Sequence, residues 1–163
     1  MSGDRKVLLV VHPSREDARE FANGLSSVLE ESGYGVISNL PDYVQGAQEI
    51  ANLEGVEIAI VLGGDGTILR AVEICRGKKI PIMGINLGSV GFLAEIQRPS
   101  FKELVSAIQR KSYTSEARLV VQYDVLRDGK KISSGWAINE VVIEGNPGEM
   151  IQLFVHIDDR PLS

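Results

Sequence analysis

The chain has 163 residues, with 17 Lys and Arg against 22 Asp and Glu, and its net charge is −5 at pH 7. Hydrophobic residues make up 44% of the chain and charged residues 24%, a balance typical of folded globular proteins and not of disordered ones. This acidic charge argues against a nucleic-acid partner, which would require a basic surface.

The sequence also argues against a membrane protein, a zinc-binding protein and a disulfide-stabilised protein. No apolar run approaches the roughly 20 residues that cross a bilayer, and the first residues lack the pattern of a signal peptide. Two His and one Cys form no zinc-binding pattern, and a lone cysteine makes no internal disulfide. We therefore expect a cytoplasmic protein with no membrane partner and no metal held by protein ligands alone.

Continuous apolar runs predict strands buried on both faces. They lie at residues 7–11 and 58–62, and further strands are expected at 35–38 and 81–85. Helical signals separate these runs. Strands that alternate with helices are typical of an α/β fold with an open, mostly parallel sheet.

The first helical segment is expected to open at Ser14, with Asp17 as its capping partner, and to end at Gly33. A weaker signal predicts a short helix over residues 44–50.

Two further helices are expected after the strands at 58–62 and 81–85. One has apolar residues on one face between residues 68 and 75. The other begins at a capping box formed by Ser100 and Glu103.

The pattern changes near residue 111, where we place a domain boundary. Alternation at residues 119–125, a turn at Asp128-Gly129 and a return strand at 132–143 predict a hairpin. A turn at 146–148 and a strand at 150–157 follow. We expect an α/β domain at 1–111 and the first strands of a mainly antiparallel β domain at 112–163.

The loop Gly63-Gly64-Asp65-Gly66 joins a buried strand to a helix. Ligands bind beyond the carboxyl ends of parallel strands, and glycines let the backbone approach them or adopt positive φ. Free N–H groups at the helix start suit phosphate. Asp65 could hold Mg²⁺ between phosphates or accept a proton from an attacking hydroxyl, and both belong to phosphoryl transfer. The alternative is that Asp65 only caps the helix.

Two other segments carry polar residues suited to a ligand. The glycine-rich segment 84–93 contains Asn86, and it contains Phe92, which could stack on a base. Asn139-Glu140 interrupts the apolar return strand, and an amide beside a carboxylate can bind the hydroxyls of a ribose. The alternatives are a core phenylalanine and a solvent-facing strand pair.

Three of these segments, taken in order, resemble the motifs of the NAD kinase family. They are GGDGT at 63–67, GINLGSVGFL at 84–93 and Asn-Glu at 139–140. GGDGT alone is shared with lipid kinases, and the other two motifs narrow the resemblance to the NAD kinase family. A further glycine-rich segment of the family, Thr-Pro-Thr-Gly-Ser-Thr-Ala-Tyr-like, does not occur in these 163 residues. We therefore expect the N-terminal portion of a longer protein, inactive by itself.

The resemblance implies transfer of a phosphoryl group from ATP or polyphosphate to the 2′-hydroxyl of the adenosine ribose of NAD, which gives NADP. It implies Asp65 as the catalytic residue, Mg²⁺ bound with the phosphoryl donor, and a homo-oligomer. The expected nucleotide-binding residues are Gly63, Gly64, Asp65, Gly66, Arg70, Asn86, Phe92, Asn139 and Glu140. The rival hypotheses are a lipid kinase that shares the loop and a nucleotide-binding fragment without turnover.

Overall fold

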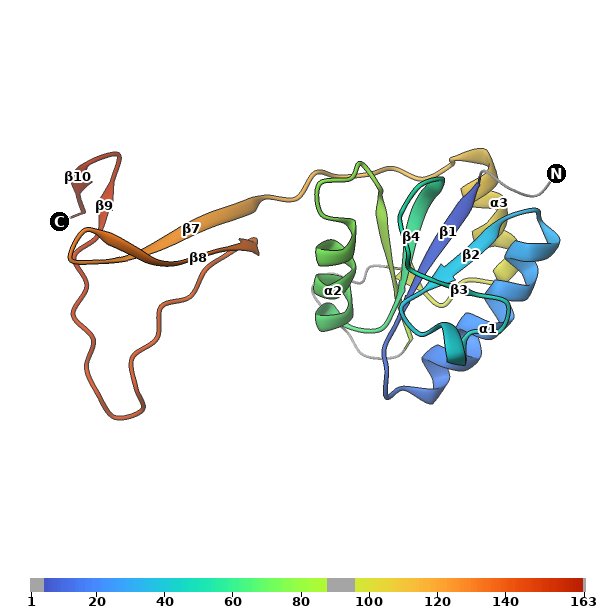
Figure 1. Cartoon of the computed structure of the whole chain (residues 1–163), viewed down its shortest axis with the longest axis horizontal. Coiled ribbons are helices and arrows are strands. Elements are labelled where there is room, and N and C mark those ends of the chain that lie inside the picture. Colours follow the sequence, from blue (N-terminus) through green and yellow to red (C-terminus); the bar gives the residue numbers. More distant parts are fainter. Residues whose placement is uncertain (1–4, 88–95, 163) are drawn as a thin grey trace. The chain divides into compact units, whose positions relative to one another are not determined.

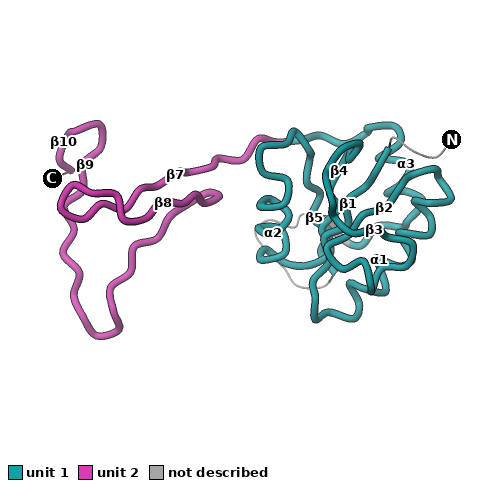
Figure 2. The backbone as a smooth tube through the Cα atoms, viewed as in Figure 1, with its two compact units in different colours: residues 1–115 teal, residues 116–163 magenta. Residues whose placement is uncertain are grey.

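The structure is a computed structural model that describes residues 5–87 and 96–162. The chain divides into two compact units, residues 1–115 and 116–163, coloured teal and magenta in Figure 2. In its described part, the first unit is a parallel sheet covered by helices, and the second consists of antiparallel strand pairs. This confirms the predicted fold class. That residues 1–111 fold as an independent domain stays a prediction.

The sheet of the first unit has the strand order β3-β2-β1-β4-β5-β6, and every neighbouring pair is parallel. The chain runs from β1 outward to β2 and β3, and then returns to β4 on the other side of β1 (Figure 1). The topological switch point therefore lies between β1 and β4. The strands are β1 (Lys6–Val11), β2 (Gly35–Ser38), β3 (Gln48–Glu49), β4 (Val56–Leu62), β5 (Ile82–Asn86) and β6 (Ile96–Gln97).

Helices cover both faces of this sheet, with α1 (Glu16–Glu31) and α3 (Phe101–Arg110) on one face and α2 (Asp65–Cys75) on the other (Figure 1). Alternate residues of β1 belong to the two cores: Leu9 packs with α1 and α3, and Leu8 with α2. This explains the continuous apolar run in β1. Full burial of each leucine contributes roughly 1.5–3 kcal/mol.

The start of α1 differs from the prediction, whereas its end confirms it. The residue before the helix is Arg15, not Ser14, and it makes no side-chain capping bond. The Asp17 carboxylate forms an ion pair with the Arg15 guanidinium, a stronger partner than the Ser14 backbone. At the other end, Gly33 has φ +86° and its N–H donates to the Glu30 carbonyl at 2.9 Å.

The helix predicted over residues 44–50 is wrong. A 3₁₀ turn at Pro41–Tyr43 precedes the edge strand Gln48–Glu49. The Asn23 side chain of α1 accepts from the Gln45 N–H at 2.6 Å and donates to the Tyr43 carbonyl at 3.1 Å. These bonds satisfy backbone groups of the segment without a helix.

The other two helices confirm their predictions. The helix α2 begins at Asp65. At the start of α3, the Ser100 Oγ accepts from the Glu103 N–H at 3.3 Å and the Glu103 carboxylate accepts from the Ser100 N–H at 3.3 Å. This is the predicted capping box.

In the second unit, β7 (Val120–Arg127) and β8 (Lys130–Ile138) form the predicted hairpin. Asp128 and Gly129 both have positive φ, 50° and 73°, as a two-residue hairpin turn requires. The return strand ends at Ile138 and not at residue 143, because its partner β7 begins opposite at Val120.

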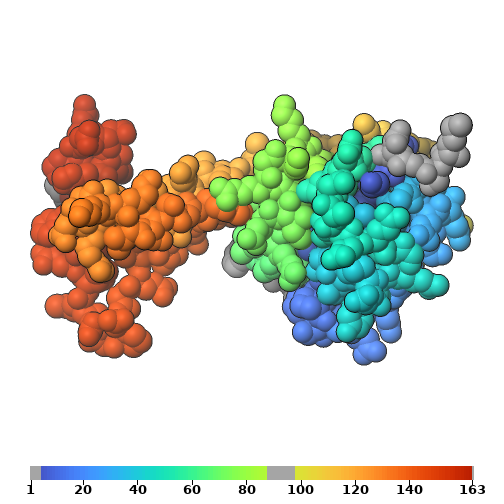
Figure 3. Space-filling model, viewed as in Figure 1, coloured from blue at the N-terminus to red at the C-terminus, as the bar shows by residue number. Residues whose placement is uncertain are grey.

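The strand predicted at 150–157 is wrong except for its last two residues. Only β9 (His156–Ile157) is regular there, paired with β10 (Arg160–Pro161). The predicted turn at 146–148 is confirmed, since the Glu149 N–H donates to the Asn146 carbonyl at 3.0 Å. Strand geometry persists only where the backbone finds a partner, and the segment between β8 and β9 is irregular apart from the turn at 146–148; it is drawn in orange-red in Figure 3.

Many apolar side chains of the second unit are exposed. Among its described residues, 116–162, none is buried. Met150 is fully exposed and Phe154 is 85% exposed. These side chains are therefore accessible to other apolar surfaces.

Candidate functional site

A cleft of about 370 Å³ lies at the carboxyl ends of β1 and β4. The end of β1 and the turn after it contribute Val11, His12, Pro13 and Arg15 to its lining, and the glycine loop and α2 contribute Gly64, Gly66, Thr67 and Arg70. The cleft thus lies at the topological switch point, where open α/β sheets bind their ligands. It brings together three of the predicted residues, Gly64, Gly66 and Arg70.

The three glycines of the loop have different surroundings. A Cβ atom on Gly63 would lie 2.8 Å from the Thr67 Cβ and 3.2 Å from the His12 Cβ, whereas Gly64 and Gly66 face open space. None of the three has positive φ. Gly63 therefore allows close packing of the loop on Thr67 and His12, and only Gly64 and Gly66 leave room for a ligand. Of the two uses of glycine considered from the sequence, close approach and positive φ, the loop uses close approach.

Asp65 is the first residue of α2 and is half-buried. The capping position before it is occupied by Gly64, whose carbonyl accepts from the N–H groups of Thr67 and Ile68 at 2.9 and 3.2 Å. The alternative in which Asp65 is the helix cap is therefore wrong. A carboxylate in the first turn still interacts favourably with the helix dipole, by about 0.3–1 kcal/mol.

Arg15 is fixed by a network that crosses the site. Its Nε and Nη2 atoms donate to the two Asp17 oxygens at 3.0 and 2.5 Å, and Nη2 also donates to the Leu87 carbonyl at 2.9 Å. The hydrogen bond from Arg15 holds the pKa of Asp17 below its ordinary value. Both partners are therefore charged at neutral pH, and the guanidinium has a defined orientation.

The end of β1 is held from both neighbouring strands. The Asn39 side chain, just after β2, accepts from the Val11 N–H at 2.7 Å and donates to the Val11 carbonyl at 3.1 Å. On the β4 side, the His12 N–H donates to the Leu62 carbonyl at 3.0 Å. These bonds fix the position from which His12 enters the cleft.

The remaining predicted residues lie outside this cleft. Asn86 is the last residue of β5, the strand next to β4, and is half-buried. Phe92 lies outside the described residues. The structure therefore places Asn86 at the same edge of the sheet as the cleft without making it part of the lining.

Asn139 and Glu140 belong to the second unit and are exposed. They follow β8 and do not interrupt it, so the prediction that they lie inside a strand is wrong. Asn139 has φ +67°, and the Glu140 N–H donates to the Ile138 carbonyl at 2.8 Å, which forms a three-residue turn. Asparagine tolerates this left-handed conformation better than most residues.

Sequence reasoning missed His12, Arg15, Thr67 and Asn39 as parts of the site or its support. Each of His12, Arg15 and Asn39 follows the end of a strand, and that was the available signal. A residue's position after a strand points to the site only once the strand order is known, because only the order shows that the β1 turn adjoins the glycine loop.

The described ranges, 5–87 and 96–162, contain neither a membrane-spanning helix nor a cluster of metal ligands. Helices there are too short or too polar to cross a membrane. Within the same ranges, no three His, Cys, Asp or Glu residues lie together as metal ligands.

Comparisons with known proteins relate the chain to a family. The family model described as the ATP-NAD kinase N-terminal domain matches residues 7–113. The NAD kinase of Mycobacterium bovis is 36% identical over 186 aligned positions, which cover 100% of this chain and 60% of that protein. The NAD kinase of Rhodococcus erythropolis is 34% identical, with 98% of this chain and 58% of that protein covered. The chain thus spans about 60% of the length of these curated relatives.

A solved structure supports the fold. Yeast NADH kinase complexed with NADH superposes with a TM-score of 0.60 at 22% identity, covering 82% of this chain and 43% of that one. At this identity the similarity concerns the fold alone. Since the family model matches more than half of the chain, across both the β1 turn and the GGDGT loop, the chain belongs to the ATP-NAD kinase family.

Proposed function

We propose that this chain provides the phosphoryl-transfer site of an NAD kinase, which moves a phosphoryl group from ATP or polyphosphate to the 2′-hydroxyl of the adenosine ribose of NAD. The observation that carries the proposal is the position of the GGDGT loop, which borders the cleft at the switch point between β1 and β4. Family membership and the name shared by the relatives, NAD kinase, support it.

In the proposed reaction, the ribose oxygen attacks the terminal phosphorus of the donor, and the bond from that phosphorus to the bridging oxygen breaks. The shortened donor leaves, and Asp65 accepts or positions the hydroxyl proton. Gly64 and Gly66 admit the phosphates, because a ligand can approach their backbone without meeting a side chain. Arg70 offsets the phosphate charge from one turn further along α2.

Other residues are proposed to bind the acceptor, NAD. We propose that Asn139 and Glu140 hold the NAD ribose or adenine, and that Asn86 and Phe92 line the pocket. Support for the first pair comes from its exposure, which leaves its amide and carboxylate accessible to a ligand. Support for Asn86 comes from its position at the end of the strand next to β4.

Magnesium is part of the proposal as a companion of the phosphoryl donor. The described residues offer single carboxylates and no cage of three ligands. This suits Mg²⁺, which commonly binds through one or two carboxylates together with substrate phosphates. When bound, the ion would neutralise phosphate charge, and Asp65 would hold it only in the alternative in which it does not accept the hydroxyl proton.

We further propose that copies of the chain associate. The exposed apolar side chains of the second unit and the unpaired edges of the β7–β8 hairpin support this, because strand edges pair with other chains. Light scattering measures the mass in solution, and a monomer at all concentrations would contradict the proposal.

The test of the function is NADP formation from NAD and ATP or polyphosphate, read with an NADP-specific dehydrogenase. The assay compares this chain alone with its fusion to the part of the Mycobacterium bovis NAD kinase that the alignment leaves uncovered. NADP formation by the fusion that depends on Asp65 supports the proposal. NAD binding without any NADP, in both proteins, would favour a nucleotide-binding module, and phosphorylation of a diacylglycerol or sphingoid base would favour a lipid kinase.

A further inference from the structure

Basic side chains meet in the cleft from both sides of the glycine loop. His12 and Arg15 come from the turn after β1, and Arg70 comes from α2. Arg70 is exposed and makes no ion pair with any residue in the described part of the chain. The balancing carboxylates nearby are Asp17, bonded to Arg15, and Asp65. The wall of the cleft thus offers donors to an anion from two separate elements.

Arg15 is held in advance of any ligand. Two of its nitrogens, Nε and Nη2, are used by Asp17 and by the Leu87 carbonyl. Its Nη1 atom has no hydrogen-bond partner among the described residues, and the side chain is 27% exposed. An arginine fixed in this way loses little side-chain entropy when it binds a phosphate oxygen.

His12 also has a defined donor. Its Nδ1 atom accepts from the Ser14 N–H at 3.2 Å. In the neutral ring the proton is therefore on Nε2, which makes no hydrogen bond within the described part of the chain. Together with Nη1 of Arg15 and the Arg70 guanidinium, this provides three donors around one cleft.

We propose that His12, Arg15 and Arg70 form the subsite for the terminal phosphates of the phosphoryl donor; this inference rests on the proposed function and names its donor site. The ligand chemistry is a chain of anhydride-linked phosphates, which ATP and inorganic polyphosphate share. The cleft, at about 370 Å³, is near the lower end of the roughly 300–1,000 Å³ range of ligand pockets. That size suits a short phosphate chain better than a whole dinucleotide.

The position of the lining residues is a second reason to expect the phosphoryl donor, and not the acceptor NAD, in the cleft. Every lining residue belongs to the first unit, beside the loop that carries Asp65. The residues proposed for the acceptor ribose, Asn139 and Glu140, belong to the second unit. A phosphate chain in the cleft would lie next to Asp65, where the hydroxyl proton is to be accepted.

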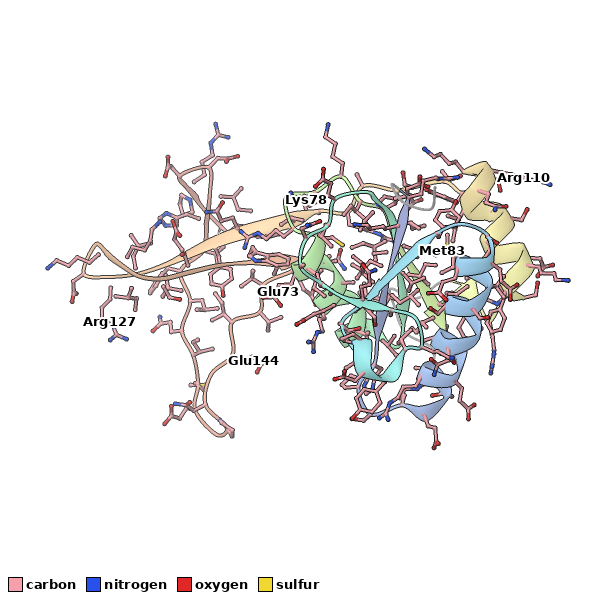
Figure 4. The ribbon with its side chains drawn as sticks, turned by 45° about the vertical axis from the view of Figure 1, so that its right-hand side comes forward. Glu73, Lys78, Met83, Arg110, Arg127 and Glu144 are labelled. Carbon is pink, nitrogen blue, oxygen red and sulfur yellow. The ribbon has the colours of Figure 1, made fainter. Side chains whose placement is uncertain are left out.

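The experiment is calorimetric titration of the 163-residue chain with inorganic tripolyphosphate, ATP and adenosine. Arg70→Gln and His12→Gln remove one donor each, and Arg15→Lys keeps the charge but loses the fixed fork. The matched control is Arg110→Gln, which removes the same charge at the last turn of α3, outside the cleft lining (Figure 4). Thermal unfolding without ligand checks that each variant is folded.

We expect the dissociation constant of tripolyphosphate to rise about 10- to 100-fold in Arg70→Gln and in His12→Gln, as the loss of a bond to a charged group predicts. The ATP constant should rise in parallel, and Arg110→Gln should bind both as the unaltered chain does. Weakened ATP binding with unchanged tripolyphosphate binding would place another part of the nucleotide in the cleft and overturn the subsite.

The inference also fails if folded Arg70→Gln and His12→Gln bind tripolyphosphate as tightly as the unaltered chain, or if that chain binds none. These outcomes do not depend on turnover. NADP formation that depends on Asp65 but not on Arg70 or His12 would retain the proposed function and refute the subsite. Absence of NADP formation, with tripolyphosphate binding weakened in the variants, would refute the function and retain the phosphate site.

Discussion

The Nη2 atom of Arg15 donates a hydrogen bond of 2.9 Å to the carbonyl oxygen of Leu87, 72 residues further along the chain. Arg15 follows β1 and Leu87 follows β5, and these strands lie on either side of β4. The bond therefore links the two loops that flank the GGDGT loop. A single side chain thus joins the loops after β1 and β5 across the end of β4.

Asp65→Asn should abolish NADP formation by the active fusion protein and leave the fold intact. The two side chains have nearly the same shape, so the change removes charge and basicity alone. Loss of a general base lowers turnover by roughly 10²–10⁴-fold. The measurement is the rate of NADP formation, with circular dichroism as the check on folding. Near-unaltered turnover in a folded variant would remove Asp65 from the catalytic role.

Asn139→Gly combined with Glu140→Gln should raise the Michaelis constant for NAD more than that for the phosphoryl donor. Glycine preserves the positive φ of residue 139 and removes only the amide, so a change in binding cannot be attributed to backbone strain. Asn139→Gly alone is the control for the turn. If the double variant leaves the constant for NAD unchanged, the pair has only a structural role.

Asn39→Ala should destabilise the first unit by about 1–3 kcal/mol, because the Val11 N–H and carbonyl both lose their side-chain partner in a part-buried position. Tripolyphosphate binding should weaken as well, since the bonds fix the strand end before His12. Asn52→Ala is the control: within the described residues, its side chain bonds only the nearby, exposed Glu54 N–H. Urea unfolding followed by circular dichroism compares the two variants, and equal stability would contradict the assigned role of Asn39.

Gly63→Ala and Gly64→Ala should act differently although they are adjacent. A methyl group on Gly63 would overlap Thr67, so we expect a loss of about 1–3 kcal/mol in the free energy of unfolding. At Gly64 the space is open and φ is −91°, so stability should change by less than about 0.5 kcal/mol while phosphate binding weakens. Unfolding and titration of both variants test this, and the reverse pattern would show that the surroundings of the two glycines are misassigned.

Glu57→Gln should reduce stability near neutral pH and have little effect in acid. Arg5 donates to the two Glu57 oxygens at 2.6 and 2.9 Å, and this hydrogen bonding holds the pKa of Glu57 below its ordinary value of 4.5. A carboxyl with a lowered pKa in the folded state contributes stability above its ordinary pKa, and that contribution is lost as pH falls below it.

The stability difference between Glu57→Gln and the unaltered chain is measured in urea at about pH 7 and about pH 3. Glu54→Gln, at an exposed position three residues earlier, is the control. The pair is partly exposed, so the difference should be small and should decrease further with added salt. A difference that is equal at both pH values would show that the Glu57 charge is not its cause.

The sequence by itself determined the elements whose signals are local. Continuous apolar runs located β1 and β4, because a strand buried on both faces can be apolar at every position. Ser100 and Glu103 located the start of α3 through bonds only three residues apart. Asp128-Gly129 determined the hairpin turn by its positive φ angles. Each of these depends on neighbours in the chain.

The tertiary structure decided the features that depend on residues far apart in the chain, namely where strands end and which side chains line the cleft. The end of β8 follows from where β7 begins, and the strand expected at 150–157 is absent wherever the described chain provides no partner. Above all, the pairing of β1 with β4 brings His12 and Arg15 beside Gly64, some 50 residues away. No local propensity encodes that pairing, because it depends on packing helices on both faces of one sheet. The sequence located the glycine loop, and the strand order determined which basic side chains face it.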